Sequence, residues 1–121
     1  MIRKIKFTSI PVRDQDRALE FYITTLGFTL VTDQAMGPGQ RWIELRPPKG
    51  DAGIALFTPD GHEDRIGTFT GVSMECDNVQ KTYEELCAKG VEFAKPPKTE
   101  SWGTAAIMKD SEGNQIVLSS S

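Results

Sequence analysis

The side chains with nucleophilic or metal-binding chemistry are few in this chain and widely spaced along it. The one histidine, His62, lies among acidic residues in the segment 59–65. An isolated loop imidazole of this kind is more often a solvated surface group than a metal ligand, because transition metals take several converging donors. Cys76 could pair with His62 as a nucleophile. However, no nucleophile elbow, P-loop or dinucleotide fingerprint supports such chemistry.

Two tryptophans and one carboxylate have the character of a ligand-binding surface. Trp42 and Glu44 share one face of a predicted strand, and Trp102 directly precedes a later one. Indole rings beside a carboxylate suit an aromatic or cationic small molecule, although such tryptophans more often belong to a core or a dimer interface. Arg41 could pair with Glu44 or reach a ligand carboxylate, but we expect it to be a surface residue.

The composition is that of a single globular domain in a reducing compartment. Of the 121 residues, 38% are hydrophobic, and the net charge of -3 argues against nucleic acid as a partner. Residues 1–6 lack the apolar stretch of a signal peptide, and no apolar run approaches the roughly 20 residues of a membrane span. We therefore expect a cytoplasmic protein with no membrane partner. Cys87 falls on the apolar side of a predicted helix, where we expect a buried, reduced thiol.

Cap and turn residues divide the first half of the chain into one helix and four strands. The strands are predicted at residues 2–12, 28–32, 41–46 and 54–58. The helix begins after Asp14, which suits an N-cap, and ends at Gly27, which suits a left-handed C-cap. This half therefore follows the order β-α-β-β-β.

The second half repeats this order after a connecting segment at residues 59–69. Its strands are predicted at residues 70–76, 91–94, 104–108 and 115–119. Asp77 or Asn78 caps the helix, and Gly90 ends it. We expect a turn at residues 96–98, and a hairpin in which Gly113 and Asn114 both adopt positive φ. Chance agreement between unrelated halves is the alternative to a true repeat.

Three stretches carry a resemblance to a known superfamily. Residues 9–28 contain an acidic cap, a Phe-Tyr pair and Leu-Gly-Phe, while residues 74–91 and 109–118 supply a second helix and a closing Gly-Asn turn. Together they resemble the glyoxalase/bleomycin resistance/extradiol dioxygenase superfamily, which has the vicinal oxygen chelate fold. The resemblance implies an α+β fold in which two tandem β-α-β-β-β modules form a curved mixed sheet with a cleft, closed by dimerisation.

The same resemblance implies one domain with module one at residues 1–58, a linker at 59–69 and module two at 70–121. It also implies a homodimer, in which modules could be exchanged between chains. Metal-using members place His, Gln or Glu ligands on the first and fourth strands of each module. The matching positions here hold Phe7, residues 54–57, Thr70 or Gly71, and Val117. We therefore expect no metal and no cofactor.

These observations favour a binding protein over an enzyme. The residues expected to contact a small organic molecule of unknown identity in an aromatic-lined cleft are Phe7, Trp42, Glu44, Phe57, Trp102 and Val117. One alternative is a metal-dependent lyase, isomerase or dioxygenase of the same superfamily. A second is a non-catalytic interaction domain whose cavity is filled by its own side chains.

Overall fold

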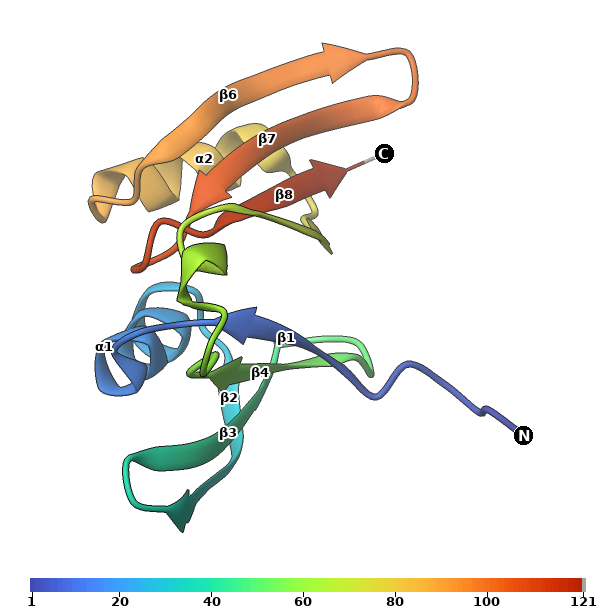
Figure 1. Ribbon diagram of the computed structural model, residues 1–121. Helices are drawn as coiled ribbons and strands as arrows, with labels where there is room; N and C mark the ends of the chain where they lie inside the picture. Colours follow the sequence, from blue (N-terminus) through green and yellow to red (C-terminus); the bar gives the residue numbers. More distant parts are fainter. Residues whose placement is uncertain (121) are drawn as a thin grey trace. The chain divides into compact units, whose positions relative to one another are not determined.

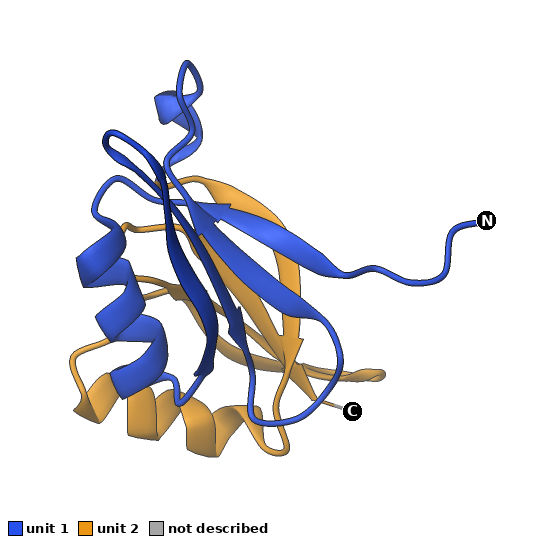
Figure 2. Cartoon of the chain, turned by 90° about the horizontal axis from the view of Figure 1, so that it is seen from below, with its two compact units in different colours: residues 1–66 blue, residues 67–121 orange. Residues whose placement is uncertain are grey.

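The computed structural model describes residues 1–120 of the chain. They form two compact units, coloured separately in Figure 2: unit 1 is residues 1–66, and unit 2 begins at Gly67. Each unit contains a four-stranded sheet and a helical segment in the order β-α-β-β-β (Figure 1). The predicted α+β fold of two tandem modules is confirmed. The eight strands are divided between two mixed sheets, and the boundary between the units lies within residues 59–69.

The sheet of unit 1 has the strand order β1-β4-β3-β2. Its strands are β1 (Phe7–Pro11), β2 (Thr29–Gly37), β3 (Gln40–Arg46) and β4 (Gly53–Phe57). β1 runs parallel to β4, and the other pairs are antiparallel. β2 is therefore parallel to β1 as well, and because parallel strands cannot be joined by a tight hairpin, the chain crosses over one face of the sheet between β1 and β2. The crossover contains α1 (Gln15–Glu20) and a π-helical turn, η1 (Phe21–Thr25), while a short 3-10 turn, η2 (Glu63–Arg65), follows β4.

The start of α1 is fixed by two polar side chains. The Asp14 carboxylate accepts a hydrogen bond from the backbone N–H of Arg17 at 3.0 Å, as the predicted N-cap requires. Gln15 is buried, and its Nε2 donates to the backbone carbonyls of Arg41 and Leu56, both at 3.0 Å. These bonds join the helix to β3 and β4, so one buried amide determines where the helix lies on the sheet.

Apolar residues on alternate positions of the strands form the core of unit 1. The strand register places Ile10, Leu56 and Ile43 side by side, and all three are completely buried. Tyr22 of the π-helical turn is also completely buried and contacts Phe28 edge to face, with ring centroids 5.6 Å apart. Figure 2 shows the helix of unit 1 along one side of its strands. The opposite side of the sheet, termed the helix-free face below, is therefore left uncovered by α1 and η1.

Unit 2 has the same plan with the strand order β5-β8-β7-β6. Its elements are β5 (Phe69–Glu75), α2 (Val79–Ala88), β6 (Phe93–Glu100), β7 (Gly103–Lys109) and β8 (Gln115–Ser120). β5 runs parallel to β8, which again requires a helical crossover. Of the two predicted caps, Asn78 is the one used, and its side chain accepts from the N–H of Lys81 at 3.0 Å. Val79 and Leu86 are the buried residues of α2.

The turn between β7 and β8 is held by a buried polar network. The Asp110 carboxylate accepts the backbone N–H groups of Glu112 and Asn114, each at 2.9 Å. Asn114 is completely buried, and its Oδ1 accepts the N–H of Gly67 at 2.8 Å. The network thus ties the first residue of unit 2 to a turn far along the chain. The expectation of positive φ at Asn114 was wrong, since within residues 1–120 only glycines, Gly113 among them, have it.

Two expectations about strand ends and turns are corrected by the structure. Residues 2–6 are not part of a strand, although the carbonyl of Lys6 accepts the N–H of Gly53 at 3.3 Å, and in Figure 1 they lead away from β1. Residues 96–98 do not turn, because they lie within β6, and the chain reverses at Ser101 and Trp102 instead. β6 tolerates its prolines since it is the terminal strand of the sheet and bulges between Lys95 and Lys98.

Cys87 was predicted to be buried, but it is exposed. Its neighbour Leu86 takes the buried position, and successive residues on a helix point about 100° apart. Cys87 therefore lies beside the buried stripe, where its thiol raises the pKa of the neighbouring Tyr83. Cys76 is half-buried, and burial raises the pKa of its thiol. Both cysteines are free.

Gly90 ends α2 in a Schellman motif, which generates the first prediction. The N–H of Val91 donates to the carbonyl of Leu86, and the N–H of Gly90 donates to that of Cys87, both at 3.0 Å. The φ of Gly90 is 89°, and an added Cβ would meet nothing within 4 Å. Gly90→Val should therefore lower the free energy of unfolding by about 1–2 kcal/mol through backbone strain alone.

Urea denaturation would measure this loss. Gly90→Asn is the matched control, since asparagine tolerates the left-handed region better than a β-branched residue does. It should lose clearly less stability than Gly90→Val. Gly27, whose φ is 79° and whose added Cβ also has open space, should respond to valine in the same way. Equal midpoints for wild type and both valine variants would contradict the assigned helix ends.

Candidate functional site

The helix-free face of unit 1 collects four of the residues predicted to contact a ligand. Ser9, Ala55 and Glu44 are neighbours in the register of β1, β4 and β3, so they form one row across this face. Side chains alternate along a strand, so residues two positions away point to the same side. Phe7, Phe57 and Trp42 therefore share the face with Glu44, as the alternation in β3 predicted for Trp42.

Trp42 is fixed by contacts at two points on its indole ring. Its Nε1 donates a hydrogen bond to Oε1 of Glu44 at 2.8 Å. Its ring meets the ring of Phe7 edge to face, with centroids 5.3 Å apart and an interplanar angle of 71°. Both geometries are favourable for an indole, which has an apolar face and one donor. The ring is therefore held in place before any ligand arrives.

The side-chain rings of Phe7 and Trp42 extend toward each other across the sheet. Phe7 pairs with Gly53 at one end of β4, whereas Trp42 precedes Glu44 and so lies toward the end that holds Phe57. Their rings can approach within 5.3 Å only above the row that contains Ala55. Ala55 is completely buried although it points to the helix-free face. Small residues thus lie at the centre of this face, and aromatic rings lie around them.

Arg41 lies on the opposite side of the sheet, since it alternates with Trp42. Its guanidinium donates to both carboxylate oxygens of Asp33, at 3.2 and 2.7 Å, and also pairs with Asp16 of α1. The hydrogen bond to Arg41 lowers the pKa of Asp33, and the bonds to Asp33 and Asp16 raise the pKa of Arg41. The suggested pairing of Arg41 with Glu44 was therefore wrong. Arg41 links α1, β2 and β3, and it is not aimed at a ligand.

Two further predicted residues belong to unit 2. Trp102 lies in the turn between β6 and β7 and is 60% exposed, so the structure gives its ring no core role. Val117 is half-buried on β8, between Ser73 of β5 and Ile107 of β7 in the register. By alternation it points away from the buried Ile116 and Leu118. The predicted set is therefore divided, with four residues in unit 1 and two in unit 2.

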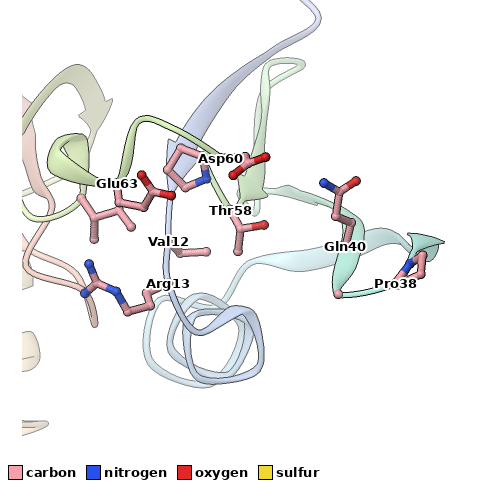
Figure 3. A pocket seen from close by; sticks show the side chains of 10 residues that line it. Val12, Arg13, Pro38, Gln40, Thr58, Asp60 and Glu63 are labelled. Atoms are coloured by element: carbon pink, nitrogen blue, oxygen red, sulfur yellow. The ribbon is translucent and has the colours of Figure 1, made fainter.

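A separate hollow of about 290 Å³ lies at the ends of β1 and β4 (Figure 3). The chain segments that line it follow these strands or form the β2–β3 turn, and they contribute Val12, Arg13, Pro38, Gly39, Gln40, Thr58, Pro59, Asp60, Glu63 and Ile66. Figure 3 shows Arg13 and Glu63 on one side and Gln40 on the other. No sequence pattern indicated this hollow, because its walls are loops brought together by the parallel pairing of β1 and β4. Backbone hydrogen bonds, including one from Gly61, lower the pKa of Glu63.

The residues at the positions implied for metal ligands do not suit a metal. Phe7, Ile54, Ala55, Leu56, Phe57, Gly71 and Val117 have no donor atom in their side chains, and the Thr70 hydroxyl already donates to the carbonyl of Gln115 at 2.8 Å. Glu44 shares a face with Phe7 and Phe57, and its carboxylate is engaged by Trp42. Across residues 1–120, no three His, Cys, Asp or Glu side chains gather as a metal site would require. The described helices also include none long and apolar enough to cross a membrane.

Comparison with known proteins identifies one superfamily. The family model described as Glyoxalase/Bleomycin resistance protein/Dioxygenase superfamily matches residues 4–118. The uncharacterized protein YetH of Bacillus subtilis (strain 168) is 30% identical over 118 residues, covering 98% of each chain.

Solved structures agree over almost the full length. A superfamily member from Sphaerobacter thermophilus DSM 20745 is 34% identical, with a TM-score of 0.89 over 99% of this chain and 98% of that one. TnmS3, an antibiotic binding protein from Streptomyces sp. CB03234, is 31% identical, with a TM-score of 0.84 over 98% and 96% of the two chains. The likeness therefore extends through both units.

The unsuitable donor set leads to a prediction about metals. A specific metal at a hundredfold excess over its dissociation constant should add about 2.7 kcal/mol to the stability of a protein. We expect no such gain with manganese, iron, cobalt, nickel or zinc, because aliphatic and phenyl groups cannot replace the water lost by the ion. Thermal unfolding with each metal, and with a chelator, measures this directly. A saturable rise in Tm with one metal, abolished by Glu44→Ala or Glu75→Ala, would contradict the prediction.

Proposed function

Since the chain belongs to the glyoxalase/bleomycin resistance protein/dioxygenase superfamily, we propose that it binds a small organic molecule on the helix-free face of unit 1, without a metal. The observation that carries the proposal is the fixed indole of Trp42, held by Glu44 and in contact with Phe7. An indole whose position is set in advance loses little side-chain entropy when a planar ligand stacks on it. Phe57 and the small side chains of Ser9 and Ala55 complete the surface.

Binding is favoured over catalysis by the chemistry of this face. It offers one carboxylate, aromatic rings and small residues, and it lacks a paired acid and base or an activated nucleophile. TnmS3 is named as an antibiotic binding protein, which supports a binding role for this chain at 31% identity. Trp102 and Val117 belong to unit 2, so they stay predictions outside this proposed surface, and the cytoplasm is the proposed location.

One observation favours the second reading, in which the chain is an interaction domain with a filled surface. The rings of Phe7 and Trp42 already touch, and Ala55 beneath them is completely buried. If these rings were permanently closed over the sheet, no ligand could reach the central row. The two readings differ in whether the fluorescence of Trp42 responds to an added aromatic compound.

Tryptophan fluorescence tests the proposed function. The chain has two tryptophans, so Trp102→Leu leaves Trp42 as the sole emitter, and Trp42→Leu leaves Trp102. Proflavine, an aromatic cation, and anthraquinone sulfonate, an aromatic anion, both quench indole emission on contact. We expect saturable quenching of the Trp102→Leu protein by at least one probe, accompanied by a rise in Tm. Trp42→Leu should weaken binding about tenfold or more, since a lost aromatic contact removes about 1.4 kcal/mol.

Linear, unsaturable quenching in wild type and in both variants would support the filled-surface reading. Thermal unfolding of each variant without probe is the control for folding. Trp102 is largely exposed, so its replacement should change Tm little. If Trp102→Leu alone abolished binding, the site would belong to unit 2 and the proposal for the helix-free face of unit 1 would fail.

A homodimer is part of the same proposal, and β2 is the segment that favours it. β2 is the terminal strand of its sheet, and it carries Leu30, Val31 and Met36, which are 41%, 48% and 61% exposed. Apolar side chains on an unprotected terminal strand mark an association surface. Symmetric pairing of two identical chains through such a strand would be isologous.

Sedimentation equilibrium tests the dimer. We expect wild type to sediment as a species of twice the 13.4 kDa chain mass at micromolar concentration. Val31→Lys should shift the equilibrium toward monomer, because two symmetry-related ammonium groups would face each other across the contact. Thr24→Lys places the same charge on the exposed side of the π-helical turn and should leave the dimer intact. A wild-type species near 13.4 kDa would rule the dimer out.

A further inference from the structure

We infer that the ligand of the helix-free face is an aromatic molecule with a protonated amine, held between the indole of Trp42 and the second carboxylate oxygen of Glu44. The inference rests on the proposed function and specifies the class of ligand. It follows from the distribution of charge on this face, from the free acceptor of Glu44 and from the spacing of the two rings.

The charge on the helix-free face comes from few residues. Among the residues of β1 to β4, the charged side chains are Asp33, Arg41, Glu44 and Arg46. Asp33 and Arg41 pair with each other, and Arg41 alternates to the helix-covered side. Arg46 also points to this face, since it lies two residues after Glu44, but it is exposed at the end of β3 rather than at the centre of the face. Glu44 is therefore the charged group at the centre of this face, next to the small side chain of Ala55.

Only one of the two carboxylate oxygens of Glu44 accepts a hydrogen bond within residues 1–120. Its Oε1 accepts the hydrogen bond from Trp42 at 2.8 Å, and within residues 1–120 its Oε2 accepts none. Glu44 is half-buried, so water screens it less than a fully exposed carboxylate. A carboxylate in this setting gains most from a charged N–H donor, which forms a stronger hydrogen bond than a neutral one. An ammonium group beside an indole is also attracted by the ring itself.

The spacing of the rings decides how an aromatic ligand can bind. Inserting a flat ring between two others requires centroids about 7 Å apart, at the upper limit for stacked pairs. The rings of Phe7 and Trp42 are only 5.3 Å apart and meet at 71°. A ligand ring must therefore stack on the indole from outside this pair, and the Glu44 carboxylate lies at the edge of that indole, beside Nε1. Ring and amine are then recognised together by Trp42 and Glu44.

Isothermal titration with three matched probes tests the inference. Naphthylmethylammonium, naphthylmethanol and naphthoate share one ring system and differ in charge. We expect the ammonium probe to bind wild type about tenfold more tightly than the alcohol, and the carboxylate probe to bind most weakly. Glu44→Gln keeps an acceptor for the indole N–H and removes the charge. This variant should bind the ammonium probe about tenfold more weakly than wild type, while its affinity for the alcohol should change less than about twofold.

The controls separate this inference from the proposed function. Glu20→Gln removes a carboxylate at the exposed end of α1 and should leave all three affinities unchanged. If the alcohol binds wild type as tightly as the ammonium probe, or if Glu44→Gln weakens both equally, the ligand class is wrong although the binding function stands. If none of the three probes gives a saturable heat, the proposed function fails, and this inference fails with it.

Discussion

The parallel pairing of the first and fourth strands in each unit is the constraint on which the rest of the structure depends. β1 runs parallel to β4, and two antiparallel pairs link β4 back to β2, so β1 is also parallel to β2 and the connection between them must be a crossover. The same holds for β5 and β6 of unit 2. The crossover carries the helix, and the helix covers one face of the four-stranded sheet. The other face is left uncovered by the helix. Each unit thus has one helix-covered and one helix-free face by the same topological rule.

The polar side chains of unit 1 have different roles on the helix-covered and the helix-free face of the sheet. Gln15 and Arg41 lie on the helix-covered side, where they bind carbonyls and carboxylates and so fix the helix to the sheet. Glu44 and Trp42 lie on the helix-free face, where their side chains form a hydrogen bond with each other. Adjacent residues in one strand, Arg41 and Trp42, therefore have unrelated roles. A substitution at one should have little effect on the role of the other.

Local signals in the sequence predicted the elements that depend on local chemistry. The caps at Asp14 and Asn78 and the glycine ends of both helices were correct, because each is set by a few adjacent residues. The turn at residues 96–98 was wrong, because the position of β6 at the end of the sheet lets its prolines stay in a strand. In the site, alternation placed Trp42 with Glu44. The contact of Trp42 with Phe7 could not be predicted, since it depends on the register of β1, β4 and β3 together.

The two prolines of β6 have a consequence for misassembly. Lys95 pairs with Ile107 and Lys98 with Ala105, so Pro96 and Pro97 share one position of β7 and interrupt the ladder. Neither proline has an N–H to offer an incoming strand, and the bulge twists the backbone away from a flat template. Amyloid-like growth by addition of further chains is therefore blocked along this side of unit 2. The irregularity that misled the sequence-based prediction thus disfavours strand addition at β6.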